Sequence, residues 1–302
     1  MSPLRAAGPK EWALLGVLAA TWGTAFAFIS FALDAAPPGA LAFARLALAA
    51  IMLTVWAYAI GEKLPGFKDK RWLWFIALGL FGNALPFTLI PWGQQFIPSA
   101  VAGILLAFMP LMTVAMAHVF TDEKMTKITT LGFGVGFAGV VVLIGPAALG
   151  GLVAGDFVAQ LAVLGAALSF AMNVVIARRA PPMHPLVSAA GMLVLAAVWT
   201  APYGLLDLIH HARPNAAGWA AALWLAIGPT ALGSVIYMRL VTTAGAGFLS
   251  TTNYIVPVVA LGAGLVLGEA IGLSAPLGLV IILVGIVIAR RGQRAASRSG
   301  QT

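Results

Sequence analysis

The chain has 302 residues, of which 61% are hydrophobic and 9% are charged, and its mean hydropathy is +1.00. An ordinary globular protein carries about 25% charged residues, so this composition excludes a soluble chain. The formal net charge of +8 suggests nucleic acid at first sight, but the positions of the cations argue against it, as shown below. The absence of cysteine excludes a disulfide framework and a thiolate metal site.

Ten apolar stretches are each long enough to cross a bilayer, which takes about 20 residues of helix. The first is longer than a signal-peptide core, so we expect it to be retained. Most connecting loops are shorter than about ten residues, which predicts antiparallel neighbours. We therefore predict an all-α membrane protein with ten transmembrane helices. The predicted spans are 12–33, 38–60, 72–93, 98–120, 127–146, 156–177, 185–207, 217–239, 245–267 and 272–290.

Lysine and arginine fall almost entirely on one side of this arrangement. Fifteen of the seventeen lie on the side of the N-terminus, while Arg213 lies on the opposite side and Arg45 lies inside a span. Basic residues are enriched in cytoplasmic loops. We therefore predict that both termini are cytoplasmic, and that the basic charge sets the topology rather than binding nucleic acid.

The chain contains an internal repeat. Residues 99–145 return in altered form as residues 246–288, and shifts of 146 or 147 residues superpose Pro110 on Pro257, Gly132 on Gly278 and Gly139 on Gly285. At the shift of 147, ATWGTAFAFIS (20–30) also lies over ALSFAMNVVIA (167–177). Each copy holds five spans, an odd number, so the second copy must cross the membrane in the opposite sense.

The predicted organisation is therefore two inverted five-helix repeats, 12–146 and 156–290. A cytoplasmic N-terminal segment, 1–11, precedes them, and a basic cytoplasmic tail, 291–302, follows them. Secondary transporters are built on this plan, with the substrate site near the midplane between the halves.

Polar and aromatic side chains from several spans are expected to form such a site. Amides and hydroxyls at that depth need partners, and either a substrate or a neighbouring helix can supply them. Trp92 is placed closer to the outer face, with Gln94 and Gln95, at the mouth. The candidate cavity residues are Trp22, Thr24, Asn83, Trp92, Asn173, Thr230, Tyr237, Asn253 and Tyr254.

Prolines interrupt several spans, at Pro86, Pro91, Pro110, Pro229 and Pro257. A proline frees a backbone carbonyl, which a membrane tolerates only where protein or water satisfies it. An ordinary kink explains any one of them. The repeat-related pair, Pro110 and Pro257, favours a gating or hinge role.

Arg45 is the one fixed charge well inside a span, on the order of 10 Å from its outer end at about 1.5 Å per residue. A charge at that depth needs a partner. An ion pair with Asp34, or helix-end carbonyls, is the expected structural partner, and a substrate carboxylate is the functional alternative. The acidic residues lie outside the spans or at their ends, so no central carboxylate indicates proton coupling.

The glycines at 132, 136, 139, 278 and 285 lie on one face of each final span. Small residues at this spacing predict close helix packing, with a contact between two copies of the chain as a second use. The sequence contains no HExxH, no metal-spaced cluster and no Walker motif, so no enzyme, cofactor or metal site is predicted.

These features resemble the drug/metabolite transporter superfamily, in its EamA-type branch of ten-helix carriers. The resemblance rests on ATWGTAFAF, on ARLALAAIML with Arg45, on the proline-to-glycine stretches 110–139 and 257–285, and on ALSFAMNVVIARR. It implies a multi-pass carrier of the bacterial inner membrane, with the fifth and tenth helices outside a central cavity. It also implies export of amino acids or related metabolites.

The function predicted from the sequence is an alternating-access carrier of small amphipathic solutes, and an exporter. An importer or an uncoupled facilitator is the alternative within this class. A lipid-modifying enzyme and a membrane receptor or assembly partner are the alternatives from other classes. The loops supply no converging acids for the enzyme, and the chain has no sizeable soluble domain for the receptor.

Overall fold

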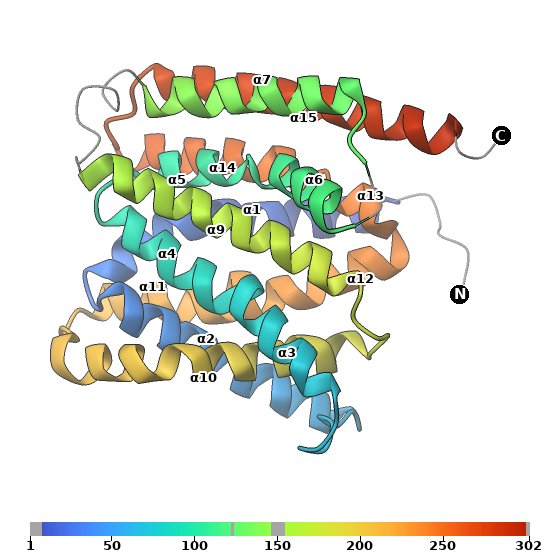
Figure 1. The fold of residues 1–302 in the computed structure, drawn as a ribbon. Coiled ribbons are helices and arrows are strands. Elements are labelled where there is room, and N and C mark those ends of the chain that lie inside the picture. Colours follow the sequence, from blue (N-terminus) through green and yellow to red (C-terminus); the bar gives the residue numbers. More distant parts are fainter. Residues whose placement is uncertain (1–7, 122–123, 146–154, 300–302) are drawn as a thin grey trace.

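The computed structural model describes residues 8–121, 124–145 and 155–299, and every regular element in those ranges is a helix. Figure 1 shows these helices running roughly side by side across the molecule. Their bounds are α1 Pro9–Leu33, α2 Pro38–Ala59, α3 Arg71–Gly79, η1 Leu80–Ala84, α4 Leu85–Gln94, α5 Ser99–Leu106, α6 Met109–Phe120, α7 Lys127–Ile144, α9 Gly155–Ala177, α10 Pro185–His211, α11 Ala216–Leu225, η2 Ala226–Leu232, α12 Gly233–Thr243, α13 Gly245–Leu249, α14 Thr252–Val266 and α15 Ser274–Ser299.

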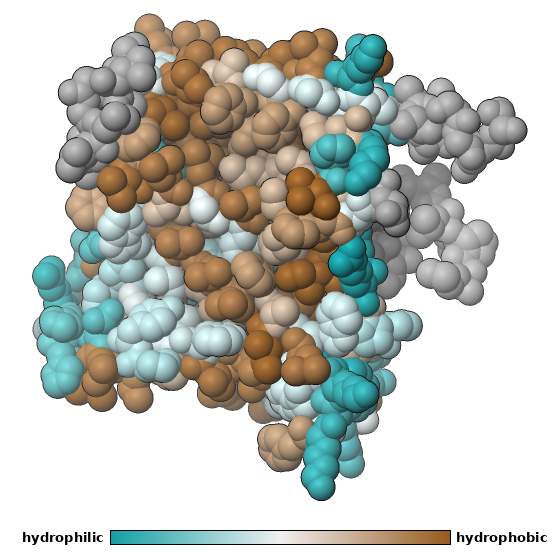
Figure 2. Space-filling view, in the orientation of Figure 1, coloured by the Kyte–Doolittle hydropathy of each residue, from teal (hydrophilic) through white to brown (hydrophobic). Residues whose placement is uncertain are grey.

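Nine helical stretches in the described residues are long and apolar enough to span a membrane. The tenth predicted span, 245–267, is divided into α13 and the shorter apolar helix α14. The prediction of an all-α, multi-pass membrane protein is confirmed. The surface agrees with it, because large apolar side chains such as Ile51, Val55 and Val266 are exposed. Figure 2 shows apolar residues across the middle, with hydrophilic residues gathered at both ends of the helices.

Two spans are broken into separate helices. The span 98–120 divides between α5 and α6, and Pro110 is the second residue of α6, where its missing N–H costs no hydrogen bond. The span 245–267 divides at Ser250 and Thr251, whereas Pro257 lies inside α14. Only one of the two repeat-related prolines therefore lies at a break, and a hinge role for either stays a prediction.

Two other spans contain a π-helical segment, which the sequence did not predict. The segment η1 lies between α3 and α4, and η2 lies between α11 and α12. Segments of this kind inside α-helices are frequent at functional sites. The shift of 147 residues that relates the two copies places residues 80–84 on residues 227–231, inside η2.

The helices α7 and α15 lie side by side along one edge of the molecule, apart from the rest (Figure 1). They approach closely because their glycine faces meet. A Cβ atom on Gly285 would lie 2.5 Å from the backbone nitrogen of Gly136 and 2.7 Å from the carbonyl oxygen of Gly132. The predicted glycine packing is therefore present, within one chain. A contact between two copies cannot use the same buried face.

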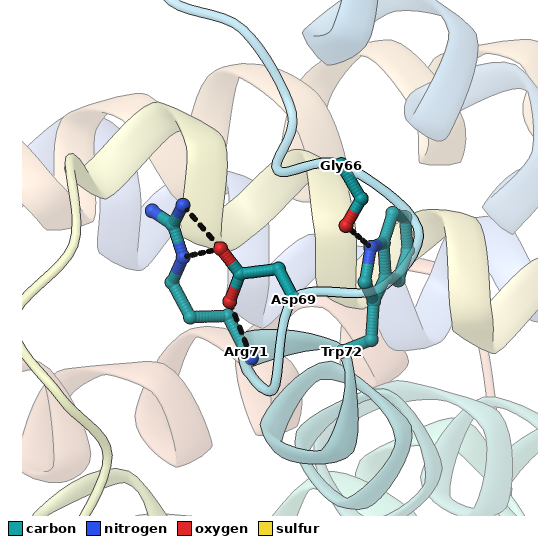
Figure 3. A network of polar contacts seen from close by, with 4 residues as sticks. All are labelled: Gly66, Asp69, Arg71 and Trp72. Atoms are coloured by element: carbon teal, nitrogen blue, oxygen red, sulfur yellow. Dashed lines mark hydrogen bonds and ion pairs between the residues drawn. The ribbon is translucent and has the colours of Figure 1, made fainter.

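The loop between α2 and α3 is ordered by a small polar network (Figure 3). The Asp69 carboxylate accepts hydrogen bonds from the backbone N–H of Arg71 at 2.9 Å and from its guanidinium at 2.7 and 3.0 Å. The indole of Trp72 donates to the carbonyl of Gly66 at 3.0 Å. The Arg71 guanidinium holds the pKa of Asp69 below its ordinary value.

Candidate functional site

Arg45 is buried in α2, with 8% of its surface exposed. Its Nε donates a hydrogen bond of 2.7 Å to the hydroxyl of Thr230 in η2, and its guanidinium carbon lies 4.1 Å from the ring centroid of Phe87 in α4. The expected ion pair between Arg45 and Asp34 is wrong. Asp34 follows the last residue of α1 and is exposed, so it does not reach a group buried between three helices.

The position of the Thr230 hydroxyl follows from the neighbouring proline. Pro229 has no N–H, so the carbonyl of Leu225 loses the donor that an α-helix would supply four residues on. The Thr230 hydroxyl donates to this carbonyl at 2.8 Å. A hydroxyl has one proton, so its remaining lone pairs are left to accept from Arg45.

Trp22 joins the same group from α1. Its indole N–H donates to the carbonyl of Pro229 at 3.0 Å. In an α-helix the Pro229 carbonyl would accept from the N–H of Gly233. In η2 this N–H bonds to the carbonyls of Gly228 and Thr230 instead. The ring of Tyr237 lies 6.0 Å from that of Trp22. Three of the predicted cavity residues, Trp22, Thr230 and Tyr237, therefore meet at one place together with Arg45.

A second polar group surrounds η1. The backbone N–H of Leu85 donates to the carbonyl of Leu80, five residues earlier. The residue five positions after Phe81 is Pro86, which has no N–H to donate to the Phe81 carbonyl. The hydroxyl of Ser169 in α9 donates to the Phe81 carbonyl instead, at 2.8 Å. Ser169 was not among the predicted site residues.

The predicted residues Asn83 and Asn173 belong to this second group. Asn83 lies in η1, and the side chain of Asn173 packs against the neighbouring Gly82, where a Cβ atom would lie 2.7 Å from its Oδ1. This Oδ1 atom is buried, and no hydrogen bond to it occurs among the described residues. A buried amide oxygen without a partner is a candidate for contact with a solute or water.

The other predicted residues lie apart from these two groups. Thr24 donates to the carbonyl of Ala20 in its own helix at 2.6 Å. Trp92 packs against Phe96, with ring centroids 5.4 Å apart. Tyr254 lies beneath the guanidinium of Arg290, with its ring centroid 4.7 Å from the guanidinium carbon, and the two residues that precede it in α14 are Thr252 and Asn253.

Gln94 was expected at the cavity mouth, yet it is buried and points inward. Its amide nitrogen donates to the carbonyl of Phe26 at 2.8 Å and lies 3.3 Å from the hydroxyl of Ser30. Gln95 instead lines a surface cavity of about 240 Å³. A second surface cavity, of about 370 Å³, lies along α15. None of the nine predicted cavity residues lines either one.

Glu269 is the acidic residue that contacts the start of α5. Its two carboxylate oxygens accept from the backbone N–H groups of Ser99 and Ala100, at 3.0 and 3.1 Å. A carboxylate at this position caps α5 and complements its dipole. Within the described ranges, no three His, Asp or Glu side chains are grouped closely enough to hold a metal ion.

The apolar surface and the apolar helices define a multi-pass membrane protein. The sequence profile of the EamA-like transporter family matches residues 10–145 and again residues 157–291. Together these stretches span most of the chain, which therefore belongs to the EamA-like transporter family. It is a membrane transporter and not an enzyme.

Curated relatives are similar over nearly their whole length. A "Probable terminal-alkyne amino-acid exporter" of Streptantibioticus cattleyicolor is 29% identical over 96% of each chain. The "Uncharacterized inner membrane transporter YedA" of Escherichia coli K12 is 27% identical over 90% of this chain and 88% of its own. The fold is also similar to that of a solved crystal structure whose chain is 21% identical in sequence. The two superpose with a TM-score of 0.64, covering 94% of this chain and 99% of the other.

Proposed function

We propose that this transporter exports amino acids or related amphipathic solutes across the bacterial inner membrane by alternating access. The relative named as a probable amino-acid exporter supports the solute class and the direction. The relative named as an inner membrane transporter supports the location. The distribution of lysine and arginine supports a cytoplasmic location for both termini.

The observation that carries the mechanism is a reciprocal pair of hydrogen bonds. Trp22 in the first half donates to η2 in the second half, and Ser169 in the second half donates to η1 in the first. Trp22 and Ser169 are equivalent under the shift of 147 residues. The exchange supports two inverted repeats whose interrupted helices meet near the midplane, where such transporters bind their solute.

In this mechanism the two π-helical segments are the parts of the structure that change. Their backbone carbonyls depend on side chains from the opposite half, so a movement of one half against the other alters these bonds. The paired α7 and α15 remain a scaffold outside the moving helices, because glycine packing locks them together. Arg45, Asn83, Asn173 and Tyr237 are the residues that we place at the solute site.

Release from proteoliposomes tests this function. Vesicles that hold the purified protein are loaded with a mixed pool of amino acids and small metabolites, with and without a pH gradient, and protein-free vesicles are the control. Selective release of a few amino acids supports the proposal, and its dependence on the gradient measures proton coupling. An absence of selective release from folded, inserted protein would contradict it.

The same experiment separates the alternative within this class. An uncoupled facilitator equilibrates its solute in both directions at equal rates, whatever the gradient. An importer of a different solute would take that solute up under a gradient that leaves internal amino acids in place. If the protein is an exporter, we expect the rate of release of an amino acid to exceed the rate of its uptake.

A further inference from the structure

Arg45 has hydrogen-bonding capacity that the protein does not use. Its Nε bonds to Thr230, and its guanidinium carbon lies over the ring of Phe87. The two terminal nitrogens, Nη1 and Nη2, have no hydrogen-bond or ion-pair partner within residues 8–121, 124–145 and 155–299. They are not among the fully buried polar atoms that lack a partner, so they keep some accessible surface. The side chain is nevertheless more than nine-tenths buried. The link between α2 and η2 uses only the Nε donor of Arg45. The N–H groups on the two terminal nitrogens are therefore free to bind another group.

The contacts that hold Arg45 also orient it. Thr230 cannot turn away, because its proton is committed to the carbonyl of Leu225. Phe87 holds the guanidinium in place through a cation–π contact. With Nε occupied and the ring of Phe87 beneath the guanidinium carbon, the edge formed by the two terminal nitrogens is the free one. Two parallel N–H groups on that edge match the two oxygens of a carboxylate.

The charge of Arg45 is uncompensated in the described part of the chain. Arg71 pairs with Asp69, and the imidazole of His211 lies 3.6 Å from the carboxylate of Asp207, and neither contact involves Arg45. A buried cation without a counter-ion costs several kcal/mol in a membrane protein. An anionic group placed against the free edge supplies the missing counter-ion and two charge-assisted hydrogen bonds.

We propose that Arg45 binds the carboxylate of the transported solute through its two terminal nitrogens. This inference rests on the proposed function and narrows its substrate class to solutes with a free carboxylate. It also agrees with the described residues, among which no acidic side chain pairs with Arg45, because a cationic solute would require a carboxylate at the site.

A comparison of acids with their amides tests the inference. Proteoliposomes are loaded with a mixed pool of the twenty amino acids or with the matching pool of amino-acid carboxamides, and release is followed by mass spectrometry. We expect wild-type protein to release its preferred amino acids about tenfold or more faster than their amides, since the amide cannot neutralise the guanidinium. Equal release of acids and amides would overturn the inference while leaving the transporter function intact. Release of neither pool would refute the proposed function, and the inference with it.

Variants locate the effect on this residue. Arg45→Gln should reduce the preference for acids to within about twofold of unity while amide release continues, and Arg45→Lys should give an intermediate ratio because it keeps the charge but not the paired donors. Arg213→Gln, at an exposed arginine in the outer loop, should retain the wild-type ratio. An unchanged preference in Arg45→Gln would contradict the inference.

A measurement on the wild-type protein covers the case in which Arg45→Gln does not fold. The melting temperature in detergent should rise with the released amino acid and not with its amide at the same concentration. An equal rise with both ligands would overturn the proposed contact.

Discussion

Trp22 and Ser169, which lie 147 residues apart, each donate a hydrogen bond to a backbone carbonyl in the opposite half of the chain. Both acceptors lie in π-helical segments. Gly233, which would donate to the Pro229 carbonyl in an α-helix, bonds to other carbonyls, and Pro86 has no N–H to offer the Phe81 carbonyl. The two side chains are chemically different, an indole and a hydroxyl, yet each donates to a carbonyl of the opposite half from an equivalent position. Because two different side chains donate to equivalent carbonyls, the position of the carbonyl in each π-helical segment, and not the type of donor, is what the two sites share.

Removal of either donor should therefore have a similar effect. Trp22→Phe and Ser169→Ala each leave a carbonyl without its partner, and we expect each to lower stability by about 1 kcal/mol and to slow transport. Thermal unfolding in detergent and release from proteoliposomes measure the two effects. Thr24→Val, which removes a hydroxyl bonded only within its own helix, is the matched control. A strong effect of one variant together with none of the other would contradict the reciprocal role.

The glycine contact between α7 and α15 should tolerate no side chain. Gly285→Ala would place a Cβ atom 2.5 Å from the backbone of Gly136, where no flexible group can move away. We expect a loss of about 1–3 kcal/mol in the free energy of unfolding. Gly134→Ala lies in α7 with nothing within 4 Å of the added atom, so it should be neutral or slightly stabilising. Equal stability of the two variants would show that the helices separate easily.

Glu269 should stabilise the N-terminus of α5. Glu269→Ala removes both acceptors from Ser99 and Ala100, and the expected loss is about 1 kcal/mol. Glu269→Gln keeps one acceptor oxygen and should lose less. Thermal unfolding of the wild type, Glu269→Gln and Glu269→Ala measures their relative stabilities. A glutamine variant less stable than the alanine variant would contradict a capping role.

Asp69 should titrate below its ordinary pKa of 3.8, because the Arg71 guanidinium stabilises the carboxylate. The contribution of this pair to stability is therefore present above pH 3.8 and is lost as the pH falls through the lower, folded pKa. Carbon-13 NMR of labelled aspartate carboxyls measures the midpoint, with Asp69→Asn to assign the signal. Arg71→Gln should return the midpoint toward 3.8. A wild-type midpoint at or above that value would refute the contact.

The sequence predicts the membrane fold well, because hydropathy alone determines where helices cross a bilayer. It predicts the contacts of Arg45 poorly. Asp34 is close in the chain, but the true partner, Thr230, lies 185 residues away and is positioned by the carbonyl that Pro229 frees. The π-helical segments also escape prediction, because a one-residue shift in hydrogen bonding leaves no trace in composition. Ser169 was within reach, since the alignment of residues 20–30 with 167–177 places it on Trp22.

In the proposed mechanism the two halves expose the solute site to the two sides of the membrane in turn. The chain has no cysteine, so single cysteines report accessibility without background. Ser30→Cys lies at the predicted outer end of α1, and Ser250→Cys lies in the break near the predicted cytoplasmic side. Labelling with a membrane-impermeant maleimide is followed with and without the released amino acid. Alternating access predicts that the amino acid raises labelling at one position and lowers it at the other. A change in the same direction at both positions, or none at either, in protein that transports would contradict it.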